Sequence, residues 1–202
     1  MDMKKVILSF VLILCILVES VTIAFAENTV RQMVLVKHQR WENPQRIYTY
    51  VPAGSRNTEL MKEAFAYWTR VTNGKVRFIY VNDIQKAQLR VRFVKDASVS
   101  SNNDNALGVT YYKKVKTVCK GISCDAYMVL TTIDIADNAP RGALLRKDAV
   151  FRVMIHEIGH SIGLSHSTDK MSVMYPTKLS RNQALSKSDF DSLAKLYGWK
   201  NY

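Results

Sequence analysis

Three of the four histidines in this 202-residue chain lie in one short segment, HEIGHSIGLSH, which runs from His156 to His166. On a helix, His156 and His160 project from the same face, so both imidazoles can reach one metal ion at ~2.0–2.1 Å. Gly163 can adopt the positive φ that turns the chain out of the helix and brings His166 back as a third ligand. Three neutral nitrogen ligands, with a fourth position open to water, are typical of a catalytic zinc site.

Glu157 follows the first ligand directly, so we expect its carboxylate beside the metal rather than bound to it. Zinc lowers the pKa of a bound water toward ~7 and polarises the carbonyl that the water attacks. Glu157 can then act as the general base on this zinc-bound water and pass a proton to the leaving amine. The residues therefore predict hydrolysis of peptide bonds. The remaining histidine, His38, lies far from the segment and is expected to be an exposed polar residue.

The helix that carries these residues is predicted over 144–164, because Val150, Met154 and Ile158 form one apolar stripe. Ser186 and Asp189 form a capping pattern for a last helix that ends at Gly198.

Earlier in the chain, Thr58 is expected to cap an amphipathic helix that closes at Asn73-Gly74. Strands are predicted over 47–51, 76–81, 89–94, 107–112 and 127–135. This order of elements predicts one α+β domain.

The N-terminal 26 residues have the pattern of a signal peptide. Lys4 and Lys5 precede an unbroken apolar run, and Ala24-Phe25-Ala26 is typical of a cleavage site. A membrane anchor is the alternative, but the apolar run is shorter than the ~20 residues that span a bilayer. We therefore expect a secreted, extracellular protein with a signal peptide over 1–26, an N-terminal arm over 27–40 and a catalytic domain over 41–202.

Cys119 and Cys124 are the two cysteines outside this leader. An oxidising compartment favours their pairing across the short loop that contains Gly121. We expect this disulfide to shape a loop rather than to hold the fold together, since a short loop removes little chain entropy.

The net charge of the chain is +12, and its apolar content of 48% is ordinary for a globular protein. A basic secreted protein is attracted to acidic surfaces such as anionic cell-surface polymers. A solvated basic surface that aids solubility is the plainer explanation. Lysine and arginine are dispersed, and no interleaving of arginine with aromatic residues marks a nucleic-acid groove. We expect a monomer that does not bind nucleic acid.

The segment HEIGHSIGLSHSTDKMSVMYP resembles the zinc motif and methionine turn of the metzincins, most closely those of the matrixins, the matrix metalloproteinase family. The similarity extends over residues 41–198. It implies a metzincin catalytic domain, with a twisted mixed sheet, a long active-site helix, a methionine turn and a C-terminal helix. Met174 would then be the methionine of the turn beneath the zinc, and it would equally be part of the core.

The same resemblance implies a substrate pocket. Tyr175 and Pro176 would begin its outer wall, and Arg152 stands where matrixins place the residue that sets its depth. The alternative is that Arg152 faces outward on the helix. The edge strand that binds an extended peptide by backbone pairing would run from Leu107 to Tyr111, and its Leu107, Gly108, Val109 and Thr110 would contact the substrate. The substrates would be extended segments of proteins or peptides.

The sequence departs from the matrixin pattern in three ways. Outside the motif only His38 remains, which is too few histidines for a second, structural zinc, so we expect one zinc per chain. Few acidic residues are available to bind calcium. Asp134 and Asp137 are candidate ligands and Asp104 is a weaker one, but no complete set of calcium ligands is present. The inhibitory cysteine motif of the family's propeptide is absent. With these departures and with its leader, the sequence resembles a bacterial matrixin-like protease.

Two alternative functions are compatible with the same sequence. A narrow processing peptidase that cuts one peptide would have the same motif. A zinc-bearing module that binds cell surfaces through its basic charge is the second alternative, although such a module has no need of Glu157 beside the metal.

Overall fold

The computed structural model describes residues 39–97, 106–120, 123–138, 145–176 and 183–200. The predicted signal peptide, most of the arm, His38 and Asp104 lie outside these ranges. The described elements, in chain order, are β1 (Ile47–Tyr50), α2 (Thr58–Val71), β2 (Phe78–Tyr80), the 3₁₀ turn η1 (Ile84–Lys86), β3 (Leu89–Val94), β4 (Gly108–Lys120), β5 (Ser123–Ala136), α3 (Lys147–Ser161) and α4 (Lys187–Tyr197). They confirm the predicted α+β class.

The five strands form one mixed sheet in the order β2-β1-β3-β5-β4. Strand β1 pairs in parallel with both β2 and β3, and β3 pairs in parallel with β5. Only two residues separate β4 from its neighbour β5 in the sequence, and so short a connection requires antiparallel strands. Strand β4 is therefore the antiparallel edge of a sheet that is otherwise parallel.

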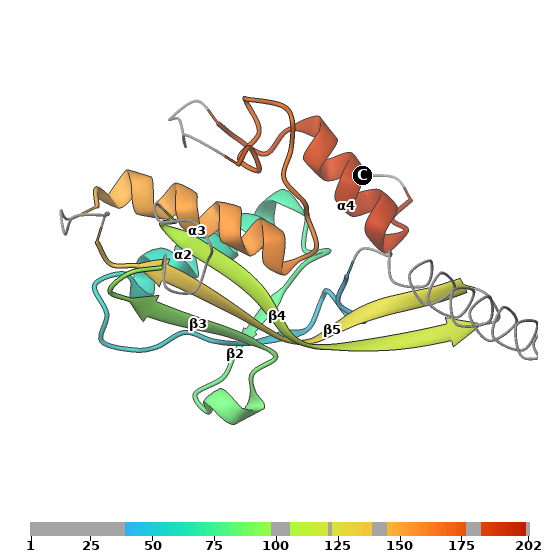
Figure 1. The fold of residues 1–202 in the computed structure, drawn as a ribbon, viewed down its shortest axis with the longest axis horizontal. Helices are drawn as coiled ribbons and strands as arrows, with labels where there is room; N and C mark the ends of the chain where they lie inside the picture. The colour runs from blue at the N-terminus through green and yellow to red at the C-terminus, as the bar shows by residue number, and fades with distance from the viewer. Residues whose placement is uncertain (1–38, 98–105, 121–122, 139–144, 177–182, 201–202) are drawn as a thin grey trace, which may run out of the picture. The chain divides into compact units, whose positions relative to one another are not determined.

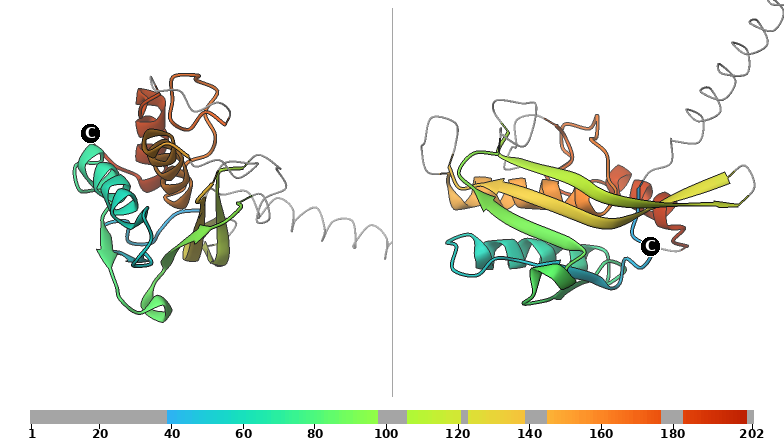
Figure 2. Two further views of the ribbon diagram at one scale, coloured as in Figure 1. Left: turned by 90° about the vertical axis from the view of Figure 1, so that its left-hand side faces the viewer. Right: turned by 60° about the horizontal axis from the view of Figure 1, so that its bottom comes forward.

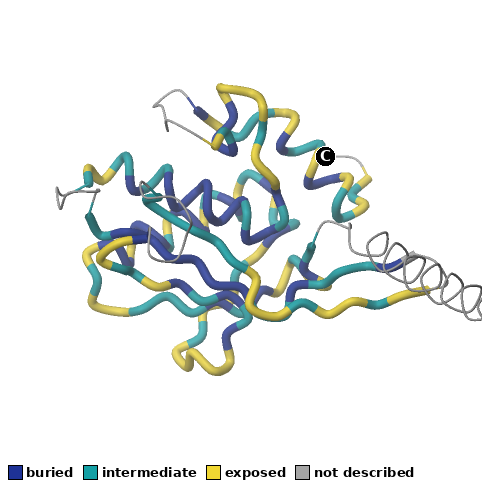
Figure 3. Tube along the Cα trace, in the orientation of Figure 1, coloured by how far each residue is buried: buried dark blue, intermediate teal, exposed yellow. Residues whose placement is uncertain are grey.

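One face of the sheet is covered by helices α2 and α3 (Figures 1 and 2). Val91 of β3 lies beside Ile133 of β5, and both are fully buried in the core. From α2, the indole nitrogen of Trp68 donates to the Ile155 carbonyl of α3 at 3.0 Å. Buried residues follow α3 and the strands opposite it (Figure 3). The core therefore holds α3 against the sheet.

Several predicted boundaries were wrong. Helix α2 begins at Thr58, so that Asn57 rather than Thr58 is the N-cap residue, and the Thr58 hydroxyl donates to the Pro52 carbonyl at 2.8 Å. Helix α3 spans 147–161, which is shorter than the predicted 144–164. Strands β4 and β5 continue beyond the predicted 107–112 and 127–135, since pairing between them satisfies their backbone groups even where side chains of β4 stay exposed.

The predicted start and end of the last helix were correct. The Ser186 side chain accepts from the Asp189 backbone N–H, and the Asp189 side chain accepts from the Ser186 backbone N–H, which makes a capping box for α4. Gly198 ends α4 in the left-handed conformation at φ 67°.

Chain contacts divide the protein into two compact units, and the residues described below as the site belong to the unit of His38–Val118 and Ala126–Tyr202. Cys119–Asp125 belongs to the other unit. Within it, Cys119 and Cys124 form the predicted disulfide. Among the residues that the structure describes, no helix is both long and apolar enough to span a membrane.

Candidate metal centre

The three histidines of the motif converge, as their spacing predicts. Helix α3 carries His156 and His160 one turn apart, and the helix ends at Ser161. Gly163 has a φ of +100°, which is the turn expected to bring His166 back toward them. One ring nitrogen from each of these histidines lies within 4.8 Å of the others.

The hydrogen bonds of two of these rings fix which nitrogen faces the centre of the cluster. His156 Nδ1 lies 2.7 Å from the Val173 carbonyl oxygen, and His160 Nδ1 lies 2.8 Å from that of Leu164. A carbonyl accepts only from an N–H, so both Nδ1 atoms carry the proton and both Nε2 atoms present lone pairs. This is the arrangement in which a neutral histidine binds a metal.

The two Nε2 atoms lie 3.1 Å apart with no proton between them. Two lone pairs at this distance repel each other unless a cation lies between them. Nitrogens bound to one tetrahedral zinc at ~2.0–2.1 Å would be separated by roughly 3.3 Å. The histidines present therefore fit a zinc ion in both chemistry and spacing.

Burial keeps these rings neutral. Burial, and then the repulsion between two imidazolium charges at His160 and the neighbouring His156, lower the pKa of His160 to about 4. Burial also lowers the pKa of His156, against the opposing effect of the Val173 carbonyl. His166 is more exposed than the other two, and partial burial of its ring lowers its pKa as well. Neutral imidazole is the ligand form, so the lowered pKa of each histidine favours metal binding.

Glu157 is only 6% exposed and lies on α3 beside the first histidine. Burial raises its pKa to about 7, and the hydroxyl of Thr110 opposes this rise. That hydroxyl, from strand β4, lies 2.8 Å from Glu157 Oε2 and 2.8 Å from the Glu157 carbonyl oxygen. A carboxyl group with a pKa near neutrality is suited to general acid and base chemistry.

Strand β4 also approaches Glu157 at Gly108. A Cβ atom at position 108 would lie 2.7 Å from Glu157 Cγ and 2.7 Å from Val153 Cγ1. Real Cβ atoms do not approach other carbons so closely, so glycine is required if the strand is to lie against the carboxylate side chain.

Two aromatic side chains hold the C-terminal end of α3. The last carbonyls of a helix have no partner within it. Trp41 Nε1 donates to the Ser161 carbonyl at 2.8 Å, and the Tyr197 hydroxyl donates to the Ile162 carbonyl at 2.9 Å. The end of the helix that carries His160 is thereby tied to the N-terminal segment and to α4.

Met174 is fully buried in the turn that follows the histidines. Its Sδ packs so closely on Gly159 of α3 that a methyl group at position 159 would overlap it. The Met174 backbone N–H donates to the Ser172 hydroxyl at 2.9 Å, and that hydroxyl donates to Asp189 Oδ2 at 2.7 Å. The same Asp189 caps α4, so this helix supports the turn beneath the histidines.

The predicted substrate-pocket residues lie on three segments around this centre. Arg152 is half-buried on α3 and forms an ion pair with Asp148 on the same helix, with an N···O distance of 3.3 Å. Tyr175 is half-buried and Pro176 is exposed directly after Met174. Leu107 directly precedes β4 and Val109 lies in it; both are half-buried, and the Leu107 carbonyl accepts from Ala136 N–H at 2.9 Å. Their roles in substrate binding stay predictions.

The candidate calcium ligands have protein partners. Arg92 donates to both carboxylate oxygens of the buried Asp134, at 2.7 and 2.6 Å. Asn57 Nδ2 donates to Asp137 Oδ1 at 3.0 Å. The guanidinium of Arg92 supplies positive charge beside Asp134, and calcium binding stays a prediction.

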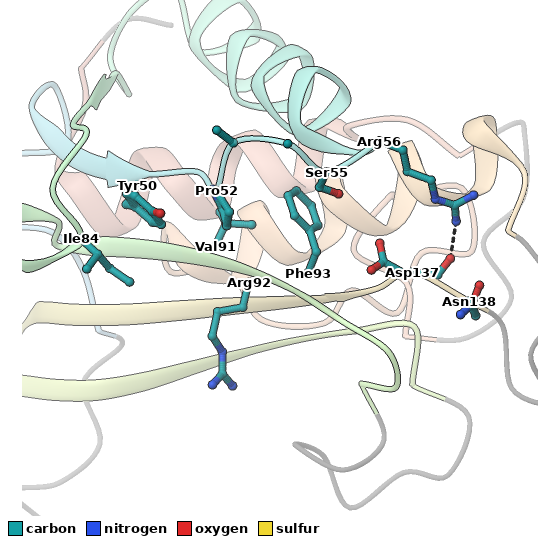
Figure 4. A pocket seen from close by; sticks show the side chains of 12 residues that line it. Tyr50, Pro52, Ser55, Arg56, Ile84, Val91, Arg92, Phe93, Asp137 and Asn138 are labelled. Carbon is teal, nitrogen blue, oxygen red and sulfur yellow. Dashed lines mark hydrogen bonds between the residues drawn. The ribbon is translucent and has the colours of Figure 1, made fainter.

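A separate open hollow of about 890 Å³ lies where β1 and β3 end (Figure 4). Its wall includes Tyr50, Phe93, Arg56 and Asp137, and Arg56 donates to the Asp137 backbone carbonyl. None of the motif histidines and neither Glu157 nor Thr110 lines it. This hollow is therefore distinct from the metal centre.

Comparison with known proteins agrees with the geometry. Residues 40–198 match the family model described as Matrixin. The chain is 31% identical over 166 residues to an interstitial collagenase of Sus scrofa, which covers 79% of the chain and 33% of that protein. It is 30% identical over 162 residues to a macrophage metalloelastase of Rattus norvegicus, covering 76% of the chain and 32% of the relative. A putative matrix metalloproteinase of Trichoplusia ni ascovirus 2c is 23% identical over 144 residues, which cover 68% of the chain and 28% of that protein. The chain thus spans about a third of the length of these curated relatives.

Proposed function

The chain belongs to the matrixin family of metzincins, and from this premise we propose that it is a secreted, zinc-dependent endopeptidase. The observation that carries the proposal is the set of three neutral histidine nitrogens within 4.8 Å of one another, beside the buried carboxyl group of Glu157. A metal-binding site alone has no need of a carboxyl group whose pKa burial raises to about 7.

His156, His160 and His166 would hold one zinc ion, and Glu157 would be the general base. A bound zinc supplies a Lewis acid for the substrate carbonyl and a more acidic water. Glu157 takes the proton of that water at its carboxylate and returns a proton to the leaving amine. The Val173 and Leu164 carbonyls keep His156 and His160 in the tautomer that leaves Nε2 available.

The proposed substrates are extended segments of proteins or peptides. Strand β4 is the last strand of the sheet, and an edge strand offers unpaired backbone groups to a further strand. Gly108 and Thr110 of this strand lie against Glu157. A peptide paired with β4 would therefore pass close to the base. Tyr175 and Pro176 would border the pocket for the residue after the cut, and Arg152 would limit its depth.

Secretion is supported by the signal-peptide pattern of residues 1–26 and by the Cys119–Cys124 disulfide, which is typical of oxidising compartments. The net charge of +12 supports attraction to anionic cell-surface polymers or acidic substrates. We include attraction to these polymers and to acidic substrates in the proposed function.

The test is cleavage of a diverse peptide library by the purified protein, with and without a zinc chelator, and by the Glu157→Ala variant. We expect cleavage at internal bonds that is lost in both controls, while Glu157→Ala still binds zinc. Cleavage of one sequence alone would favour a narrow processing peptidase. No cleavage by the folded, zinc-loaded protein would favour a zinc-bearing binding module.

A further inference from the structure

Strand β4 contributes a polar side chain directly to the carboxyl group of Glu157. The Thr110 hydroxyl oxygen lies 2.8 Å from Oε2 and 2.8 Å from the Glu157 main-chain carbonyl oxygen, so its one proton is shared between these two acceptors. Thr110 and Glu157 are 47 residues apart in the sequence. Among the described residues, this hydroxyl is the group that forms a hydrogen bond with the Glu157 carboxyl group. Because Glu157 is buried, few solvent contacts compete with it.

The contacts on the two sides of the carboxyl group differ. Oε2 faces the hydroxyl of Thr110, whereas Oε1 lies on the side of Gly108, where a Cβ atom would be 3.1 Å away. Among the described residues, no hydrogen bond reaches Oε1, so its lone pairs would be available to the proton of the attacking water. The strand thus holds one carboxylate oxygen and leaves the other for the reaction.

We propose that Thr110 is a positioning residue that orients the Glu157 carboxylate for proton transfer, in addition to any contact of its backbone with substrate. This inference rests on the proposed peptidase function. A general base must lie within hydrogen-bonding reach of the proton that it takes, and misplacement by about 1 Å can cost ~100-fold in rate. A hydrogen bond from a neutral donor to a carboxylate supplies this restraint.

The test compares Thr110→Val, Thr110→Ser and Thr131→Val in the zinc-loaded protein. Valine keeps the shape of threonine without its hydroxyl, and serine keeps the hydroxyl. Thr131 is a matched control in the neighbouring strand β5, because it is fully buried and its hydroxyl has no hydrogen-bond partner among the described residues. Each variant is assayed for kcat, KM, zinc affinity by chelator competition, and stability in urea.

We expect Thr110→Val to lower kcat about 10- to 100-fold, as loss of a hydrogen bond to a charged group predicts, with little change in KM or zinc affinity. Thr110→Ser should recover most of this loss, and Thr131→Val should keep full activity. A crystal structure of Thr110→Val should show the Glu157 carboxylate displaced. If Thr110→Val does not fold, Thr110→Ala provides the same loss of the hydroxyl with less bulk.

The proposal is overturned if Thr110→Val or Thr110→Ala is as active as Thr131→Val, or if Thr110→Ser is as impaired as Thr110→Val. Failure of the underlying function has a different signature, because the parent protein would then cleave no peptide, or Glu157→Ala would cleave as well as the parent.

Discussion

Gly163 permits the turn between the second and third histidines, and its replacement by alanine should destabilise the protein through two separate effects. The first is backbone strain, since φ at this position is +100°. A residue with a Cβ atom pays ~1–2 kcal/mol for a left-handed conformation. The second is steric overlap, because the new Cβ would lie 2.5 Å from Leu196 Cδ2 and 2.6 Å from the Gln39 carbonyl oxygen. Overpacking of this kind costs ~1–3 kcal/mol.

The two effects together predict a loss of about 2–5 kcal/mol in the free energy of unfolding of Gly163→Ala. Gly54→Ala is the matched control, because φ at Gly54 is +81° and no atom lies within 4 Å of its added Cβ. This control should lose only the ~1–2 kcal/mol of backbone strain. Because the Gln39 carbonyl belongs to the backbone, its overlap with the new Cβ of Gly163→Ala cannot be relieved by a change of rotamer.

The assay is equilibrium unfolding in urea, followed by circular dichroism, with the zinc-loaded and the chelated protein. Gly163→Ala should also bind zinc more weakly, because His166 follows the strained turn, whereas Gly54→Ala should keep the parent affinity. Equal stability of the two variants would refute the steric argument. Unchanged zinc affinity of Gly163→Ala would refute the claim that this turn positions the third ligand.

Three further predictions concern the groups around the metal centre. In the zinc-free protein, Glu157→Gln should be more stable than the parent above about pH 7, because burial raises the pKa of Glu157 to about 7 and the parent must then bury a charge. This advantage should disappear as the pH falls toward 4.5, where the protonated Glu157 is also neutral. Urea unfolding across this pH range measures the difference in stability, and a difference that does not change with pH would contradict the prediction. Trp41→Phe should lose ~1–2 kcal/mol in the free energy of unfolding, because the Ser161 carbonyl loses the hydrogen bond from the indole. Urea unfolding measures this loss, and an unchanged stability would show that the indole does not stabilise the end of α3. Asp189→Asn should lower the free energy of unfolding by more than ~1 kcal/mol and weaken zinc binding, because Asp189 caps α4 and accepts from Ser172. The control Asp191→Asn, at an exposed ion pair, should lower it by only ~0–1 kcal/mol. Equal effects of the two changes would show that α4 does not support the methionine turn.

The metal centre was predictable because its geometry is mostly local. Two ligands four residues apart on a helix share a face whatever the rest of the chain does, and the glycine needed for the return of His166 stands in the motif itself. The capping box of Ser186 and Asp189 was predictable for the same reason. The start of α2 was predicted less well, because Asn57 is its N-cap residue and the hydroxyl of Thr58 donates to the Pro52 carbonyl.

The residues that support the site escaped prediction because their partners are distant in the sequence. Thr110 and Glu157 are 47 residues apart, and Trp41 reaches Ser161 across 120 residues. No periodicity encodes such pairs. Gly108 did carry a usable signal, since a glycine inside a strand often marks a close approach of another group. The length of β4 had no such signal, because its lysine-rich second half lacks the alternation of a half-buried strand.

The helix that carries the zinc motif has low helix propensity between its two histidine ligands. Gly159 lies inside α3 and costs ~1 kcal/mol relative to alanine in an exposed helix. Alanine is excluded here because its methyl group would overlap Met174 Sδ and lie 3.1 Å from Trp68 Cζ2. The last turns of α3 are therefore held by contacts from α2, from β4 and from the methionine turn rather than by intrinsic helix propensity. It follows that the helical state of this segment, and with it the shared face of His156 and His160, depends on the intact tertiary structure, and we expect an isolated peptide of this segment not to form the helix.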